Sequence, residues 1–81
     1  MRKLAMPDQF QFTIVLEPQL EGGFTVSVPA LPEVVTEGDS EDEALRMAED
    51  AIRLALSYRR DHGLLIPSDA TPSVRTITVA A

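Results

Sequence analysis

The chain has 81 residues, 44% hydrophobic and 25% charged, a composition typical of one globular domain rather than of a disordered segment. It contains no cysteine, which excludes disulfides and thiolate metal sites as reinforcement of a small core. A net charge of −6 argues against binding nucleic acid through the general surface, because phosphate neutralisation requires lysine and arginine. Self-association is the remaining way to stabilise so short a chain, so we expect a homo-oligomer, either a dimer or a tetramer.

The N-terminal residues predict neither a membrane span nor a signal peptide. No apolar run approaches the roughly 18 residues that a transmembrane helix requires, and Met1-Arg2-Lys3 is not followed by an apolar core. Residues 1–9 contain Pro7 and no periodicity, which indicates a flexible leader. We therefore expect a cytoplasmic protein with a single domain over residues 10–81.

Two alternating segments predict a β-hairpin. Residues 10–17 place apolar side chains at every second position, and residues 24–28 do the same. Gly22-Gly23 between them is a turn signal, so the two strands should pair antiparallel. The apolar face consists of Phe10, Phe12, Ile14, Leu16, Phe24, Val26 and Val28.

The remaining elements complete a β-β-β-α-β order, which is an α+β fold. Residues 34–36 form a short third strand, residues 40–63 a helix, and residues 74–79 a fourth strand in which Ile77 and Val79 share a face. A strand reached through a crossover helix usually lies parallel to its neighbour. We place the fourth strand beside the first, which predicts a small mixed sheet of order 3-2-1-4 with the helix on one face. The other face would carry Thr13, Val15, Thr25 and Ser27.

Signals at both ends of the helix predict where it begins and stops. Ser40-Glu41-Asp42-Glu43 is typical of a capping box, in which the Ser40 hydroxyl accepts from the Glu43 amide and the Glu43 carboxylate reaches back to the Ser40 amide. Gly63 supplies the left-handed residue that ends a helix.

The apolar face of the helix has two flanks around a stripe of small residues. At about 100° per residue the four alanines at 44, 48, 51 and 55 share one narrow stripe, which suits close packing on a sheet. One flank is Leu45, Ile52 and Leu56, and the other is Met47, Leu54 and Tyr58. The apolar arc is roughly 200° wide, about twice what a surface helix needs. Either the helix straddles a narrow sheet, or the flank of Met47, Leu54 and Tyr58 contacts a second chain.

Catalytic chemistry finds little support, and we predict a protein that is not an enzyme and has no cofactor. The single histidine, His62, lies at a helix C-terminus, where a cation is favourable for structural reasons alone. A metal-dependent nuclease would need convergent carboxylates, for which the candidates are Glu17, Glu37, Asp39 and Glu43. Their spacing does not predict such a cluster.

Five of the seven residues from 37 to 43 are acidic. This cluster suits both solubility and the positive end of the helix dipole, and it also suits a basic protein partner that is attracted by its field. If a partner exists, we expect it to contact Glu37, Asp39, Glu41 and Asp42.

A series of short motifs runs from residue 22 to residue 67. It consists of Gly22-Gly23-Phe24 leading to Pro29, Leu31-Pro32 followed by Thr36-Glu37-Gly38-Asp39-Ser40, Glu43-Ala44-Leu45 with Ala48 and Ala51, and Gly63 with Ile66-Pro67. In this order the motifs resemble those of HicB-like antitoxins. The family's Gly-Cys after Leu-Pro is Glu33-Val34 here, and Val34 is a mild change if this position fills the core.

The resemblance implies a partial ribonuclease-H-like fold and a function in protein binding. A HicB-like antitoxin would neutralise HicA, a small basic ribonuclease, by covering its RNA-facing surface. Many members carry a C-terminal DNA-binding domain, for which this chain has no room, so we expect a short single-domain member. The alternatives are an orphan HicB-like domain that senses a small molecule or regulates as an oligomer, and, less favoured, a remnant metal-dependent nuclease.

Overall fold

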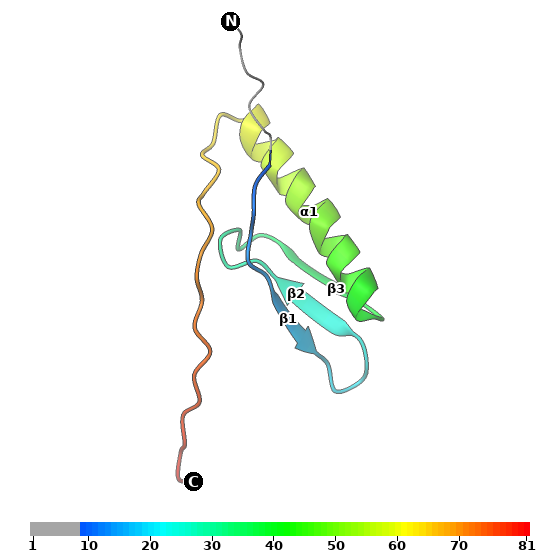
Figure 1. The fold of residues 1–81 in the computed structure, drawn as a ribbon, viewed down its shortest axis with the longest axis vertical. Helices are drawn as coiled ribbons and strands as arrows, with labels where there is room; N and C mark the ends of the chain where they lie inside the picture. Colours follow the sequence, from blue (N-terminus) through cyan, green and yellow to red (C-terminus); the bar gives the residue numbers. More distant parts are fainter. Residues whose placement is uncertain (1–8) are drawn as a thin grey trace, which may run out of the picture.

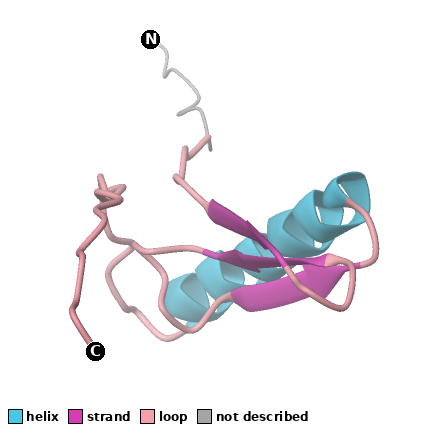
Figure 2. Cartoon of the chain, turned by 90° about the horizontal axis from the view of Figure 1, so that it is seen from below, coloured by secondary structure: helices cyan, strands magenta, loops and turns pink. Residues whose placement is uncertain are grey.

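The computed structural model describes residues 9–81 and consists of three strands followed by one long helix (Figure 1). The elements are β1 (Val15–Pro18), β2 (Phe24–Ser27), β3 (Val35–Gly38) and α1 (Glu41–Asp61). The three strands form one antiparallel sheet of order β1-β2-β3, and α1 covers one face of it (Figure 2). The α+β class predicted from the sequence is therefore confirmed. The leader predicted for residues 1–9 lies, except for residue 9, outside the described residues.

The hairpin between β1 and β2 forms where the glycine pair predicts it. Gly22 and Gly23 have φ angles of 99° and 84°, which are left-handed conformations that side chains disfavour. The turn is closed by hydrogen bonds from Gly22 N to Gln19 O and from Gln19 N to Gly23 O, both 3.0 Å. The resulting register pairs Leu16 with Val26, so their side chains share one face of the sheet.

The core lies between this face and the alanine stripe of α1. One cluster contains Val26, Ala44 and Ala48, against which Leu16 and Phe24 pack. Because the alanine side chains are short, the helix axis approaches the strands closely. The apolar face predicted from alternation in the first two strands is thus the face that α1 covers.

A second cluster extends the core beyond the end of the sheet. It is formed by Val28, Leu31 and Val34, and the second half of α1 packs on it through Ala51, Ile52, Ala55 and Leu56. Leu31 and Val34 lie in the connection between β2 and β3, where hydrogen bonds from Leu31 N to Val28 O and from Val34 N to Leu31 O hold two tight turns. The prediction that Val34 fills the core is confirmed, since its side chain is buried.

The predicted sheet order 3-2-1-4 is not matched, because residues 74–79 join no sheet in the described part of the chain. The chain leaves α1, contacts Thr13 through Asp69 and then runs away from the body as an extended segment (Figures 1 and 2). Alternation of branched residues predicts extended backbone but not the strand that will pair with it. The paired part of the first strand is also shorter than the predicted residues 10–17.

In residues 9–81, no helix combines the length and the apolar composition that crossing a membrane requires.

Candidate protein-binding surfaces

The acidic loop, which we define as residues 37–42, comprises the end of β3, the two connecting residues and the start of α1, and it is shaped by Gly38. A Cβ atom added to Gly38 would lie 2.5 Å from Ala44 N and 2.8 Å from Ala44 Cα, so the first turn of the helix rests directly on this glycine. The loop is anchored further by Ser40 Oγ, which accepts from Glu43 N at 3.1 Å. The sequence prediction of the helix cap requires one correction: the Glu43 carboxylate accepts from Asp39 N at 2.6 Å, not from Ser40 N. The Glu43 side chain therefore reaches past the capping residue Ser40 to the residue before it.

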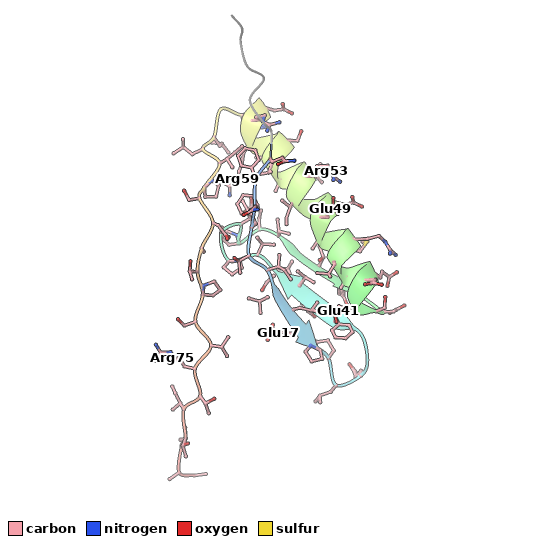
Figure 3. All side chains as sticks on the ribbon, viewed as in Figure 1. Glu17, Glu41, Glu49, Arg53, Arg59 and Arg75 are labelled. Carbon is pink, nitrogen blue, oxygen red and sulfur yellow. The ribbon has the colours of Figure 1, made fainter. Side chains whose placement is uncertain are left out.

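All four predicted partner-binding side chains are exposed at this end of the molecule. They are Glu37, Asp39, Glu41 and Asp42, and Figure 3 shows Glu41 pointing outward from the start of α1. Next to them lies an open hollow of about 230 Å³ whose lining includes Gly23, Phe24, Glu37, Asp39 and Met47. The fold therefore places a row of carboxylates beside a mostly polar hollow that Phe24 and Met47 also line.

The helix flank of Met47, Leu54 and Tyr58 is exposed, with relative accessibilities of 49%, 72% and 57%. The opposite flank is better covered, since Ile52 and Leu56 are half-buried over the N-terminal part of the chain. The helix therefore does not straddle the sheet symmetrically. The exposed flank of Met47, Leu54 and Tyr58 is left uncovered by the sheet, and its contact with a second chain stays a prediction.

One residue that belongs to this surface was missed by the sequence analysis. Val35 in the edge strand β3 is 62% exposed and lines, with Leu54 and Tyr58, an apolar groove of about 320 Å³. The available signal was alternation: Val34 is buried, so its neighbour in an extended strand must point the other way.

The groove is bounded by an ion pair between Glu33 and Arg59. The Arg59 side chain donates to the Glu33 carboxylate from Nε at 3.1 Å and from Nη2 at 2.9 and 3.0 Å, and from Nη1 to Leu65 O at 3.1 Å. The pKa of Glu33 lies below its ordinary value, chiefly because its own backbone N–H donates to the carboxylate, and also because of Arg59. Partial desolvation acts in the opposite direction. This pair ties the β2–β3 connection to the end of the helix and to the segment that follows it.

At the end of α1, His62 takes a structural position. Its ring stacks on Tyr58 with centroids 3.9 Å apart, and Nδ1 lies 2.8 Å from Tyr58 O, to which it donates. Gly63 follows with φ 66°, the left-handed conformation predicted for the residue that ends the helix.

Replacing Glu33 with glutamine is expected to lower the free energy of unfolding at pH 7 by about 0.5–1 kcal/mol, because an exposed but multiply bonded pair is lost. Since folding lowers the pKa of Glu33, its stabilising effect is present above the unfolded pKa and disappears as the pH falls through the folded pKa. Urea unfolding of both proteins from pH 7 to pH 3 tests this: the difference should shrink at the acidic end. Glu49→Gln, in an exposed pair with Arg53, is the control. A Glu33 difference that persists unchanged to pH 3 would contradict the assignment.

No group of three or more His, Cys, Asp or Glu side chains that could hold a metal ion occurs in residues 9–81. The carboxylates considered for a nuclease, Glu17, Glu37, Asp39 and Glu43, thus do not converge in the described structure. Glu43 is engaged at the helix cap.

The fold and its exposed surfaces define a small α+β domain in which a sheet carries one helix, an acidic loop and an apolar flank. The chain belongs to the HicB_like antitoxin family of bacterial toxin-antitoxin systems, whose family model matches residues 11–80. The resemblance noted from the motifs is therefore confirmed.

Three relatives illustrate the range of the family. Antitoxin HicB 1 of Photorhabdus laumondii is 42% identical over 57 residues, which are 70% of this chain and 37% of the relative. Antitoxin HicB of Escherichia coli K12 is 35% identical over 57 residues, 70% of this chain and 41% of the relative. The UPF0150 protein Ta0767 of Thermoplasma acidophilum is 34% identical over 71 residues, 88% of this chain and 99% of the relative. The chain spans less than half the length of the antitoxins it matches.

Proposed function

We propose that this protein is an antitoxin that binds and neutralises a small basic ribonuclease toxin of the HicA type. Membership of the family carries the proposal, because the relatives of Photorhabdus and Escherichia coli are named as HicB antitoxins. The function is one of binding rather than catalysis.

The proposed contact with the toxin is the acidic loop, through Glu37, Asp39, Glu41 and Asp42. These side chains are exposed, and the protein carries a net charge of −6, so the field around it attracts a basic protein. The hollow beside the loop, which Met47 and Phe24 line, offers apolar contact once the partner has docked.

Growth rescue tests the proposal directly. A HicA-type ribonuclease from the same genome is induced in a host that also expresses this chain, and survival and mRNA integrity are measured. We expect the chain to restore growth and to co-purify with the toxin in a stoichiometric complex. If toxicity persists and the purified chain binds no small basic protein, the antitoxin assignment is wrong, and an oligomeric or ligand-sensing regulatory module becomes the better hypothesis. A thermal-shift screen of metabolites would then follow, since ligand at 100 times its Kd adds about 2.7 kcal/mol.

Charge reversal in the acidic loop is expected to slow association with the toxin. The variant Asp39→Lys/Asp42→Lys should reduce the association rate constant about tenfold at low ionic strength, with a smaller change in the dissociation rate. The deficit should shrink at higher salt, because screening weakens long-range attraction. Stopped-flow or surface-plasmon measurements at two salt concentrations provide the test.

The control is Asp50→Lys/Asp61→Lys, which changes the net charge equally at exposed positions along the helix. If both double variants slow association by the same factor, the effect comes from net charge and the acidic loop is not the contact. Thermal unfolding of each variant verifies that the fold is intact.

We also propose that the protein self-associates. The exposed flank of Met47, Leu54 and Tyr58, together with Val35, supports this, since it is an apolar patch next to the open edge of β3. A partial ribonuclease-H-like sheet of order 3-2-1-4 is our proposal for the assembled protein rather than for the isolated chain.

A further inference from the structure

The segment after Asp69 is extended and joins no sheet among the described residues. Ile77 and Val79 are 82% and 79% exposed, although their spacing is that of a strand that buries one face. No hydrogen bond or ion pair in the described structure involves residues 71–81. Figure 3 shows Arg75 on this extended segment, away from the sheet and the helix. We call residues 71–81 the tail.

The chain just before the tail is fixed to Thr13, two residues before β1. Thr13 donates to Asp69 twice, from N to Oδ1 and from Oγ1 to Oδ2, both at 2.7 Å. The pKa of Asp69 is lowered first by the Thr13 amide and then by the Thr13 hydroxyl, so this carboxylate is ionised while it holds the contact. Pro72 follows three residues later, and it lacks the backbone N–H that a ladder with a neighbouring strand requires.

The β1 edge offers an unfilled apolar site. Among the described residues β1 pairs with β2 alone, so its other side has free backbone groups. Between the segment that leads into β1 and α1 lies a groove of about 270 Å³ whose lining includes Phe10, Phe12, Ile14, Leu45 and Ile52. A strand added to this edge would present every second side chain to the groove, and Ile77 and Val79 have that spacing.

We propose that the tail of one copy adds to the β1 edge of a second copy, with Ile77 and Val79 covering that copy's groove, and that the exchange is reciprocal. Every copy carries one unpaired tail and one open β1 edge, so a two-fold pair satisfies both at once. The tail begins shortly after Asp69, which is bound to Thr13 near β1, whereas β3 lies at the opposite edge of the sheet. The β1 edge is therefore favoured over the β3 edge. The exchanged strand would supply in trans the fourth strand that the sequence predicts beside the first. This inference does not depend on the toxin.

Isotope-filtered NMR distinguishes exchange from folding back within one chain. An equimolar mixture of ¹³C-labelled and unlabelled 81-residue chains is equilibrated and examined for NOEs between labelled and unlabelled molecules. We expect NOEs from the methyl groups of Ile77 and Val79 to Phe12, Ile14 and Leu45 of the other copy. Contacts to these residues within one chain only, contacts to Val35 and Leu54 instead, or a tail without contacts would each overturn the proposal.

Paired variants provide a second measurement. Ile77→Asp/Val79→Asp should weaken the dimer at least tenfold by sedimentation equilibrium, because charges would enter the groove. Thr76→Asp/Thr78→Asp adds the same charge on the other face of the same segment and should weaken it much less. A monomeric wild-type chain, or equal loss in both variants, refutes the exchange. Growth rescue by a monomeric chain would refute the exchange and leave the antitoxin proposal intact. Loss of rescue by an intact dimer would contradict the antitoxin proposal and leave the exchange intact.

Discussion

Gly38→Ala is expected to lower the free energy of unfolding by about 3 kcal/mol, the upper part of the range for overpacking a close contact. The added methyl group would lie 2.5 Å from Ala44 N and 2.9 Å from Glu43 C. These are backbone atoms of the first helical turn, so no side-chain rotation can relieve the clash. The helix must move away from β3 or the β3–α1 connection must open, and either change loosens the packing around Ala44.

Gly63→Ala is the matched control, because a Cβ there meets nothing within 4 Å while the φ of 66° is unfavourable for alanine. It measures backbone strain alone, which we expect to cost about 1–2 kcal/mol. Urea unfolding at one fixed protein concentration compares the two variants. If Gly38→Ala costs no more than Gly63→Ala, the close approach of helix and strand is not a determinant of stability. The acidic loop would then owe its shape to the helix cap rather than to Gly38.

Leu31→Ala is expected to destabilise the protein by about 3 kcal/mol, within the range for truncating a fully buried leucine. Leu31 is 0% exposed and belongs to the cluster with Val28 and Val34 that supports the second half of α1. Its backbone is held on both sides by hydrogen bonds to neighbouring turns, so the connection cannot easily collapse into the space left by the side chain. The cavity should therefore remain largely unfilled.

Leu20→Ala provides the control, because Leu20 in the hairpin turn is 107% exposed and should change stability by less than about 0.5 kcal/mol. Thermal and urea unfolding measure both. A cost for Leu31→Ala as small as that for Leu20→Ala would mean that the β2–β3 connection is not part of the core. A large loss of stability would show that Leu31, although it lies in a connecting loop, contributes to the core.

Features that depend on neighbouring residues in the chain were predictable. The helix cap at Ser40, the turn at Gly22-Gly23 and the apolar face of the hairpin follow from local hydrogen bonding, allowed φ angles and side-chain periodicity. The hydrogen bond of the Glu43 side chain at this cap was not predictable. Glu43 accepts from Asp39 N because the backbone at the end of β3 turns the Asp39 amide toward the Glu43 carboxylate. The placement of the acidic residues on an exposed loop also follows from the sequence, since they flank the start of a helix.

Other features required the tertiary structure. Burial of Leu31 has no periodic signal, because the connection that contains it is neither helix nor strand. The groove at Val35 and Leu54 exists only because α1 lies asymmetrically over the sheet.

The sequence by itself determined the first three strands and the helix, their order and the apolar faces of the hairpin and the helix, because these depend on spacings of two and 3.6 residues along the chain. The tertiary structure decided how they pair. It leaves residues 74–79 extended and unpaired although their alternation is that of a strand. Backbone hydrogen-bonding groups are the same at every residue, so alternation cannot specify which edge, or which copy, a strand will join.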